Sequence, residues 1–415
     1  MSEYSNKRVN YNYYIISQCI VMLNCFLSCL EIYPSKLVNY SYILIGIAIV
    51  FYLLSKVYIN FKFTLVNASF LVLFGYMILT DIINSNFTSF VCLMDLSSFI
   101  LFFVFSFSGN SKENTKRSIF ILLVVCVICS TLISIASIFV FINKPPKIDL
   151  LSGVTGNRNI LAAYTIVGVI SSLALLIINT RKKGLLIISL IINLYTLFTT
   201  KSRTPLTVLT VFLIVMLIYY FFGNSKKKNK KLSLFGFIIL SIIILTCSLT
   251  FIINRNNVSF TSQSLKNIIN KISSNRLEIW TVCFQIIKNN PIFGVSNNAY
   301  QEIMMNALNF PGNQHNVYIS LMTLNGIPSL LIYLFIICFT LISSIITIKE
   351  LERNEEKRMI FLYLAILFGF LVGDNFECNT FRSYIPISYI VFLMYSALDN
   401  ERVYIKEREI NFEPK

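Results

Sequence analysis

The chain has 415 residues, of which 56% are hydrophobic and 13% are charged, and its mean hydropathy is +0.71. Soluble proteins carry about 25% charged residues, and a soluble fold of this size could not cover so much apolar side chain with polar surface. The composition therefore excludes an ordinary soluble domain and predicts one polytopic membrane bundle.

The net charge of +16 would favour a nucleic-acid partner in a soluble protein. Here the basic residues lie in short loops between apolar runs, as the positive-inside bias requires, so no nucleic-acid partner is expected. Most of the ten cysteines lie inside apolar runs, where they act as small hydrophobes. We therefore expect neither a disulfide framework nor a zinc site.

A helix needs about 20 mostly apolar residues to cross a hydrocarbon core of about 30 Å. Runs of this kind predict an all-α polytopic membrane protein with about 12 transmembrane helices. The predicted spans are Tyr13–Leu30, Tyr40–Leu54, Phe63–Ile83, Phe87–Phe107, Ser118–Ile142, Asn159–Asn179, Leu185–Thr200, Pro205–Phe222, Leu232–Ile253, Val317–Ile348, Met359–Gly373 and Tyr384–Leu398. The second and eleventh are short, and the tenth is long enough to tilt.

Lysine and arginine concentrate in alternate loops and at both ends of the chain, which predicts that both termini are cytoplasmic. The first run has no small-residue cleavage site and is expected to be retained as a span. Four parts follow: helices 1–5 within residues 1–150, helices 6–9 within 151–253, an outer loop over 254–316, and helices 10–12 with a cytoplasmic tail over 317–415. A lone acid, Asp95, lies within the fourth span and is expected to make a structural hydrogen bond.

The outer loop contains the only tryptophan of the chain, Trp280, and the only histidine, His315. Leu277, Ile279 with Trp280, Phe284 and Ile287 recur at helical spacing from Arg276 onward. This helix is predicted to end at the sequence NNPIFG, because proline cannot continue it and glycine suits a tight turn. A connector of about 20 residues that contains Pro311 and Gly312 should then lead to His315.

Three arginines are predicted on the outer side, where the positive-inside bias selects against them: Arg158, Arg203 and Arg276. They could be interface residues that snorkel, or partners of outer carboxylates such as Asp149, Glu278 or Asp374. Alternatively, they could converge on phosphate or pyrophosphate, because the guanidinium fork matches phosphate oxygens.

His315 precedes the tenth predicted span, for which Asn316 is a candidate N-cap. A histidine at this position could cap or pack against the helix. It could also serve as a general base, because imidazole titrates near neutral pH.

The order of these motifs resembles a known family. Arg-x3-Trp, then PIFGVS, then HNVYISLMTLNGIP resembles the C-terminal module of the O-antigen ligase and Wzy-type polysaccharide polymerase family. Upstream, TGNRNILAAY and KSRTPL are similar to the Gly-x-x-Asn-x-Asn and Ser-Arg elements of that family. The resemblance covers about Gly153 to Pro328. Arg158 stands where the family often has proline.

The resemblance implies an enzyme that moves a glycan from an undecaprenyl-pyrophosphate carrier to an acceptor hydroxyl on the outer face of the bacterial cytoplasmic membrane. It implies His315 as the catalytic base and Arg203 and Arg276 as pyrophosphate-binding residues. Arg158 is a further candidate for substrate binding, and Asn316 and Tyr318 are candidate sugar contacts. The outer loops lack Asp-x-Asp and hold few acids, so no metal and no other cofactor are expected.

The leading hypothesis is a polymerase that joins lipid-linked repeat units, with a ligase that uses another acceptor as the alternative within the family. Expected partners are undecaprenyl-pyrophosphate-linked oligosaccharide, membrane lipid, and a flippase and a chain-length regulator of the same pathway. A flippase or secondary transporter would have a similar number of spans, but transporters place polar groups near the midplane. A structural scaffold would predict that substitution of His315 or Arg203 leaves polymer formation intact.

Overall fold

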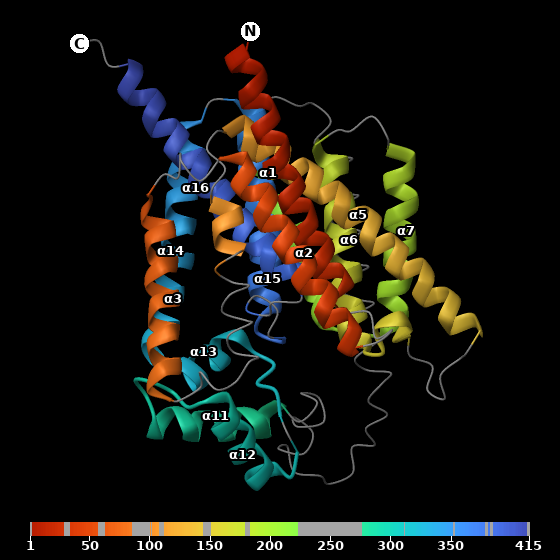
Figure 1. Cartoon of the computed structure of the whole chain (residues 1–415), viewed down its shortest axis with the longest axis vertical. Coiled ribbons are helices and arrows are strands. Elements are labelled where there is room, and N and C mark those ends of the chain that lie inside the picture. The colour runs from red at the N-terminus through yellow and green to blue at the C-terminus, as the bar shows by residue number, and fades with distance from the viewer. Residues whose placement is uncertain are drawn as a thin grey trace.

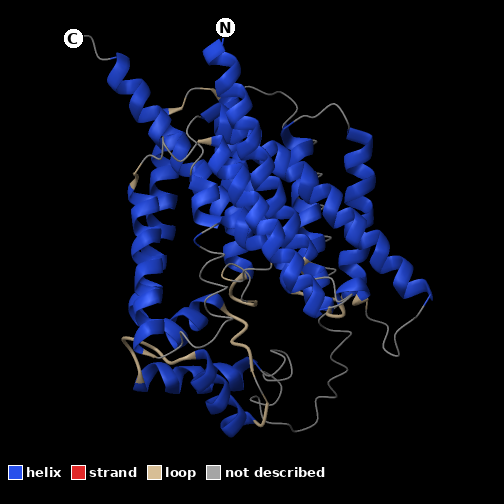
Figure 2. Cartoon of the chain, in the orientation of Figure 1, coloured by secondary structure: helices blue, strands red, loops and turns tan. Residues whose placement is uncertain are grey.

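The computed structural model describes residues 2–28, 34–56, 63–84, 100, 102–107, 112–143, 151–178, 183–222, 276–310, 312–351, 353–377, 381 and 385–412. Within these ranges every regular element is helical (Figure 2). The all-α class is therefore confirmed for the part of the chain that is described. The predicted ninth span, Asp95, Asp149 and most of the fourth span lie outside it.

The helices fall into three groups in chain order. The first group is α1 (Ser2–Leu27), α2 (Pro34–Ser55), α3 (Leu65–Ile83), α5 (Lys112–Asn143), α6 (Arg158–Ile178), α7 (Lys183–Thr200) and α8 (Thr204–Phe222). The second group is α11 (Arg276–Asn289), α12 (Asn297–Leu308) and α13 (Val317–Asn325). The third group is α14 (Ile327–Glu350), α15 (Asn354–Gly373) and α16 (Pro386–Phe412).

Among the described residues, five helices are long and apolar enough to cross a membrane: α3, Asn114–Asn143 of α5, α6, α7 and α14. Two shorter apolar stretches, Ile43–Ser55 and Thr204–Tyr220, coincide with further predicted spans. These helices support a multi-pass membrane protein. The total of twelve spans stays a prediction.

Several helices are longer than hydropathy predicted, because charged residues extend them. The short eleventh span becomes α15, a helix of 20 residues that begins in the sequence NEEKR. Its first turn carries Glu355 and Glu356, where negative charge complements the helix dipole. Likewise, the last predicted span, Tyr384–Leu398, becomes α16, whose 27 residues include a charged second half.

The prediction that Val317–Ile348, the tenth span, forms one helix was wrong. The chain breaks at Gly326, whose φ of +82° separates the short α13 from the long α14. Such a φ favours glycine over residues with a Cβ. The membrane-crossing part is therefore α14 alone, and α13 is a separate helix next to His315.

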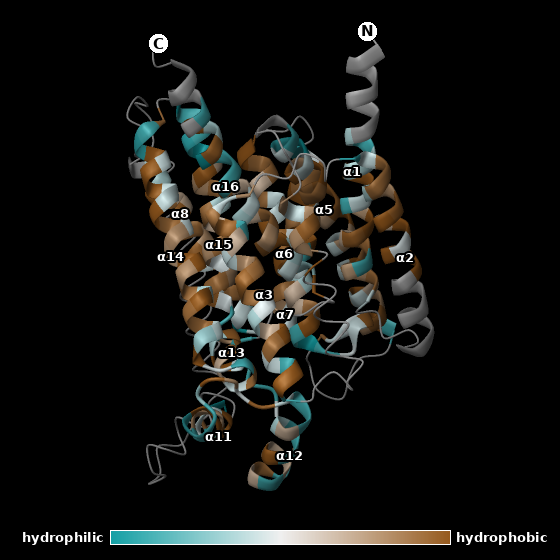
Figure 3. Ribbon diagram, turned by 60° about the vertical axis from the view of Figure 1, so that its left-hand side comes forward, coloured by the Kyte–Doolittle hydropathy of each residue, from teal (hydrophilic) through white to brown (hydrophobic). Residues whose placement is uncertain are grey.

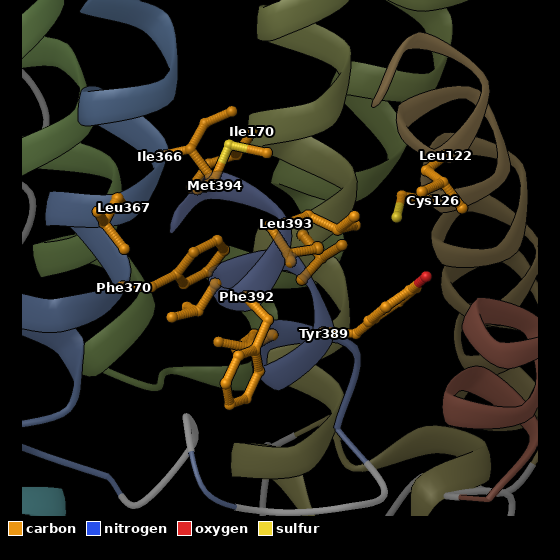
Figure 4. Close-up of a cluster of buried hydrophobic side chains, with 14 of the residues drawn as sticks. Leu122, Cys126, Ile170, Ile366, Leu367, Phe370, Tyr389, Phe392, Leu393 and Met394 are labelled. Atoms are coloured by element: carbon orange, nitrogen blue, oxygen red, sulfur yellow. The ribbon is translucent and has the colours of Figure 1, made fainter. Parts of the chain in front are cut away.

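The core lies around α6, α15 and α16. Figure 4 shows Ile170 of α6, Phe370 of α15 and Met394 of α16 packed together, with Leu122 and Cys126 of α5 to one side. In α6, 78% of the apolar window is buried, against 28% in α14. We conclude that α6 is a central helix, whereas α14 turns most of its surface outward.

Close packing of α8 and α15 depends on two glycines one helical turn apart. A Cβ at Gly373 would lie 2.7 Å from a methyl of Val208, and a Cβ at Gly369 would lie 3.0 Å from the carbonyl oxygen of Val208. Small residues at this spacing let membrane helices approach closely. The end of α15 is thereby held against the start of α8.

A polar network ties α7 to α5 and α6. Asn193 accepts a hydrogen bond from Ser134 (2.9 Å) and donates to Thr131 (3.0 Å) and to the carbonyl of Ser189 (2.9 Å). Gly168 of α6 lies against the same amide, where a Cβ would be 2.8 Å from its oxygen. Because all polar atoms of Asn193 are paired, this buried amide links the helices without an unsatisfied group.

Both termini lie at one end of the bundle, and α11 and α12 lie at the other (Figure 1). The bundle is largely apolar along its length, whereas α12 carries many hydrophilic residues (Figure 3). This arrangement places the predicted outer segment opposite to the chain ends. Which end faces the cytoplasm stays a prediction.

Candidate functional site

Helix α11 contributes one side of a small separate hydrophobic core, which lies at the end of the bundle opposite to the termini. Ile279, Val282, Cys283 and Ile286 are buried against Tyr300 and Met304 of α12 and Ile319 of α13. Phe284, predicted to lie on this apolar face, is instead 54% exposed. Burial raises the pKa of the Cys283 thiol, so this residue acts as part of the core.

The connector between the NPIFG turn and His315 is mostly helical, because it contains α12, a helix that was not predicted from the sequence. Ser296 caps the N-terminus of α12, where its hydroxyl accepts a hydrogen bond from the Ala299 amide at 3.0 Å. Asn309 ends the helix in the left-handed region, with φ of +60°. Helix α12 therefore occupies most of the segment between the turn and His315.

His315 is held in a specific backbone conformation. Its φ is +50°, in the left-handed region that few non-glycine residues adopt. On one side, the carbonyl of Gln314 accepts a hydrogen bond of 2.8 Å from the indole Nε1 of Trp280. On the other side, Asn316 caps α13 through its hydrogen bond from the Ile319 amide at 3.0 Å, which confirms the predicted N-cap.

Glu377, in the turn after α15, joins two of the predicted site residues. One carboxylate oxygen lies 2.8 Å from Nη2 of Arg276, and the other lies 2.9 Å from Nδ1 of His315. The amide of Asn159 also donates to Glu377, at 3.4 Å. The Glu377 side chain is 13% exposed and that of His315 is 31% exposed, so the cluster is sheltered but open to a substrate.

This geometry explains the Arg-x3-Trp spacing. Residues four apart lie on the same face of a helix. Arg276 opens α11 and reaches Glu377, while Trp280 holds the backbone next to His315. The two side chains of one helical face therefore fix His315 from opposite directions.

The other two arginines adjoin a hydrogen bond between the starts of α6 and α8. Ser202 donates to the side-chain oxygen of Asn159 at 3.2 Å. Arg158 precedes Asn159 in the chain, and Arg203 follows Ser202. Both arginines are half-buried. Because Asn159 also contacts Glu377, the structure brings the starts of α6 and α8 together with the His315 cluster.

The start of α13 is bonded to the end of α15. The Asn316 amide donates to the carbonyl of Asn375 (3.1 Å), and the Tyr318 hydroxyl donates to the carbonyl of Leu371 (2.9 Å). The Val317 amide donates to the carbonyl of Asp374 (2.9 Å). These bonds keep the Glu377 turn beside His315. A sugar contact of Asn316 or Tyr318 stays a prediction.

Sequence reasoning missed Glu377. It had considered Asp374, from the same turn, as a partner for an outer arginine, but the Asp374 side chain lies in the interior at 0% exposure. Glu377 instead pairs with Arg276, so that arginine does have a carboxylate as its partner. The sequence did offer one signal for Glu377. Asp374 and Glu377 lie in one predicted loop, and the predicted topology puts that loop on the same side of the membrane as the three arginines.

The contacts of the imidazole define its chemistry. An ionised carboxylate can only accept hydrogen bonds, so Glu377 assigns the proton of neutral His315 to Nδ1. The lone pair then resides on Nε2, which can accept a proton from a hydroxyl. A carboxylate that orients a histidine is a recurring arrangement for a general base.

Metal ligation was also tested on the described residues. No group of three or more His, Cys, Asp or Glu side chains there could hold a metal ion. The closely spaced Cys126 and Cys129 of α5 are free thiols within a predicted span. Metal independence stays a prediction for the reaction.

A histidine, a carboxylate and an arginine thus meet at one end of an apolar bundle. Residues 188–334 match the model of a protein family described as O-antigen ligase. This part of the chain is therefore similar to the O-antigen ligase family, and the match suggests a membrane glycosyltransferase of the ligase or polymerase type. Comparison with curated proteins found no match.

The match includes Arg203, Arg276 and His315 and confirms the resemblance that their motifs indicated. It begins after Arg158 and ends before Glu377. The contacts of Asn159 and Glu377 therefore add residues from both sides of the matched segment to the candidate site.

Proposed function

We propose that the protein is a polysaccharide polymerase that transfers glycan from an undecaprenyl-pyrophosphate carrier to a hydroxyl of another lipid-linked repeat unit. The single observation that carries this proposal is the Arg276–Glu377–His315 cluster at the end of the bundle opposite to the termini. Its position lets a prenyl chain remain in lipid while the charged headgroup reaches the protein. The outer face of the bacterial cytoplasmic membrane is the proposed location.

In the proposed reaction, Nε2 of His315 removes the proton from the acceptor hydroxyl. The hydroxyl oxygen forms a bond to the anomeric carbon of the donor glycan. The bond from that carbon to the pyrophosphate oxygen breaks, and its electron pair leaves with undecaprenyl pyrophosphate. Glu377 stabilises the imidazolium that forms, because its carboxylate lies 2.9 Å from Nδ1.

Arg203 and Arg276 are the proposed pyrophosphate-binding residues, with Arg158 as a further contact. Three guanidinium groups and one carboxylate, Glu377, leave a net positive charge for an anionic leaving group. Preorganised positive charge of this kind stabilises the transition state when negative charge develops on the leaving oxygen. Asn316 and Tyr318 are proposed sugar contacts with a second role in holding α13.

The test uses purified protein in nanodiscs with a synthetic undecaprenyl-pyrophosphate repeat unit and EDTA. A ladder of lengthening glycan is expected from the wild type and from Glu302→Gln, which removes an exposed charge on α12. His315→Asn should abolish the ladder; asparagine tolerates the left-handed backbone of this position but lacks the imidazole. A full ladder from His315→Asn would refute the proposed base.

The description of the matched family favours a second candidate, a ligase that transfers glycan to a different acceptor. The same assay separates the two functions. If no ladder forms but an added second acceptor is glycosylated, the ligase is supported and the polymerase is refuted.

A further inference from the structure

The turn between α11 and α12 exposes two large apolar side chains. Ile292 is 55% exposed and Phe293 is 38% exposed. The four residues of this turn, Pro291 to Gly294, include no charged side chain. Two adjacent apolar side chains are therefore exposed in the polar segment at this end of the molecule, and exposed apolar surface of this kind can mark a contact with lipid or protein.

The backbone of this turn is fixed on the side of α13 and α14. The Ile327 amide donates to the carbonyl of Pro291 at 2.7 Å, and the Val295 amide donates to the carbonyl of Thr323 at 3.0 Å. A Cβ at Gly326 would lie 1.7 Å from the carbonyl oxygen of Ile292, so the two backbones are in direct contact. The backbone contacts with α13 and α14 therefore hold Ile292 and Phe293 in their exposed positions.

The same turn is also bonded to α3, at Tyr76 within the helix and at Asn84 after its last residue. The Tyr76 hydroxyl donates to the carbonyl of Ile292 at 2.5 Å, and the Asn84 amide donates to the carbonyl of Phe293 at 2.9 Å. α3 is one of the helices able to cross a membrane, and Asn84 directly follows its last residue. The turn thus lies level with the end of a membrane span.

The surface of α3 near this end is apolar and exposed. Leu79 is 46% exposed, Ile82 is 57% exposed and Ile83 is 47% exposed. On a membrane span, such residues face lipid. Ile292 and Phe293 are joined by hydrogen bonds to α3 and to the residue that follows it, so their side chains continue its lipid-facing surface.

We infer that Ile292 and Phe293 insert into the membrane leaflet on the α11–α12 side and anchor this part of the protein to the lipid surface. The hydrogen-bonded backbone of the turn lies at the depth of the lipid headgroups, and Tyr76 is an interfacial aromatic residue. Lys288, exposed one turn upstream on α11, adds positive charge beside anionic headgroups.

The anchor also fixes the depth of α11, which runs across the long axis of the bundle in Figure 1. Helix α11 has 14 residues. At about 1.5 Å per residue it extends roughly 21 Å. Arg276 lies at its other end, so the anchored turn and the Glu377 contact hold the helix at both ends. The lipid contact itself does not depend on the proposed catalytic function.

The test is fluorescence quenching by brominated acyl chains, in nanodiscs of phosphatidylcholine and phosphatidylglycerol. Phe293→Trp is compared with Phe310→Trp, a matched control because Phe310 is 37% exposed and follows α12. Trp280 is kept in both variants, so the folded site is undisturbed and the wild type supplies the baseline.

Brominated lipid should quench the added fluorescence of Phe293→Trp at least twofold more than that of Phe310→Trp. Equal quenching, or a residue 293 signal quenched only by iodide in the aqueous phase, would overturn the inference. The measurement needs no substrate, so its failure is distinguishable from the failure of the proposed glycan transfer.

Discussion

Glu377→Gln is the substitution that tests the candidate site most directly. Glutamine has nearly the same size and can still hydrogen-bond, but it removes the charge that faces both Arg276 and His315. The two contacts are 2.8 and 2.9 Å long, and the Glu377 side chain is 13% exposed. The loss should therefore affect activity more than folding.

The size of the effect follows from the two hydrogen bonds. A hydrogen bond to a charged group contributes about 1.5–3 kcal/mol, and a neutral hydrogen bond about 0.5–1.5 kcal/mol. Replacing two charged hydrogen bonds by two neutral ones therefore removes about 2–3 kcal/mol. Solvent at the partly exposed imidazole screens part of this, which leaves roughly 1.4–2.8 kcal/mol. At about 1.4 kcal/mol for each factor of ten, the transfer rate should fall about 10- to 100-fold.

The assay is the initial rate of glycan transfer in nanodiscs, with donor concentration varied. We expect kcat to fall because His315 loses the partner that holds its proton on Nδ1. Glu377→Asp keeps the charge on a shorter side chain and should give a rate between glutamine and wild type. Glu302→Gln serves as the control on the exposed face of α12. A wild-type rate for Glu377→Gln, at equal protein level and unchanged melting temperature, would refute the assigned role.

Three further predictions concern packing, coupling and orientation. Gly326→Ala should destabilise the protein by about 2–4 kcal/mol, from left-handed strain and overpacking against the Ile292 carbonyl. Gly46→Ala, with open space around its Cβ, should not lower the melting temperature. Asn159→Ala should reduce the transfer rate about threefold to tenfold through loss of its long hydrogen bonds with Glu377 (3.4 Å) and Ser202 (3.2 Å), and an unchanged rate would remove its coupling role. Asn306→Cys, exposed on α12, should react with impermeant maleimide in intact cells; labelling only after permeabilisation would reverse the proposed orientation.

Parts of the site could be predicted from sequence because their causes are local. The helix from Arg276 follows from apolar spacing, and its end follows from Pro291. The capping of α13 by Asn316 depends on an amide only three residues away. Such features depend on nearest neighbours along the chain, so a short window contains the information that determines them.

The break at Gly326 could not be predicted in the same way. Hydropathy summed along the chain treats α13 and α14 as one apolar run, although one glycine separates them. The break is accompanied by a contact with the carbonyl of Ile292, which belongs to a different segment. Only the folded arrangement shows why a left-handed residue is needed there.

Glu377 was missed for a related reason. It lies 62 residues from His315 and 101 residues from Arg276 in the chain. No local pattern distinguishes this glutamate from other loop acids. Its role arises because hydrogen bonds between the end of α15 and the start of α13 bring it to the imidazole.

The late position of Glu377 has a consequence for biosynthesis. During translation, the arginines and His315 emerge well before the turn that follows α15. A nascent chain that has inserted every helix up to α14 holds the proposed base and the proposed pyrophosphate-binding arginines, but it lacks the carboxylate that joins them. We therefore expect the proposed base to gain its carboxylate partner only once α15 and the turn that follows it have been made.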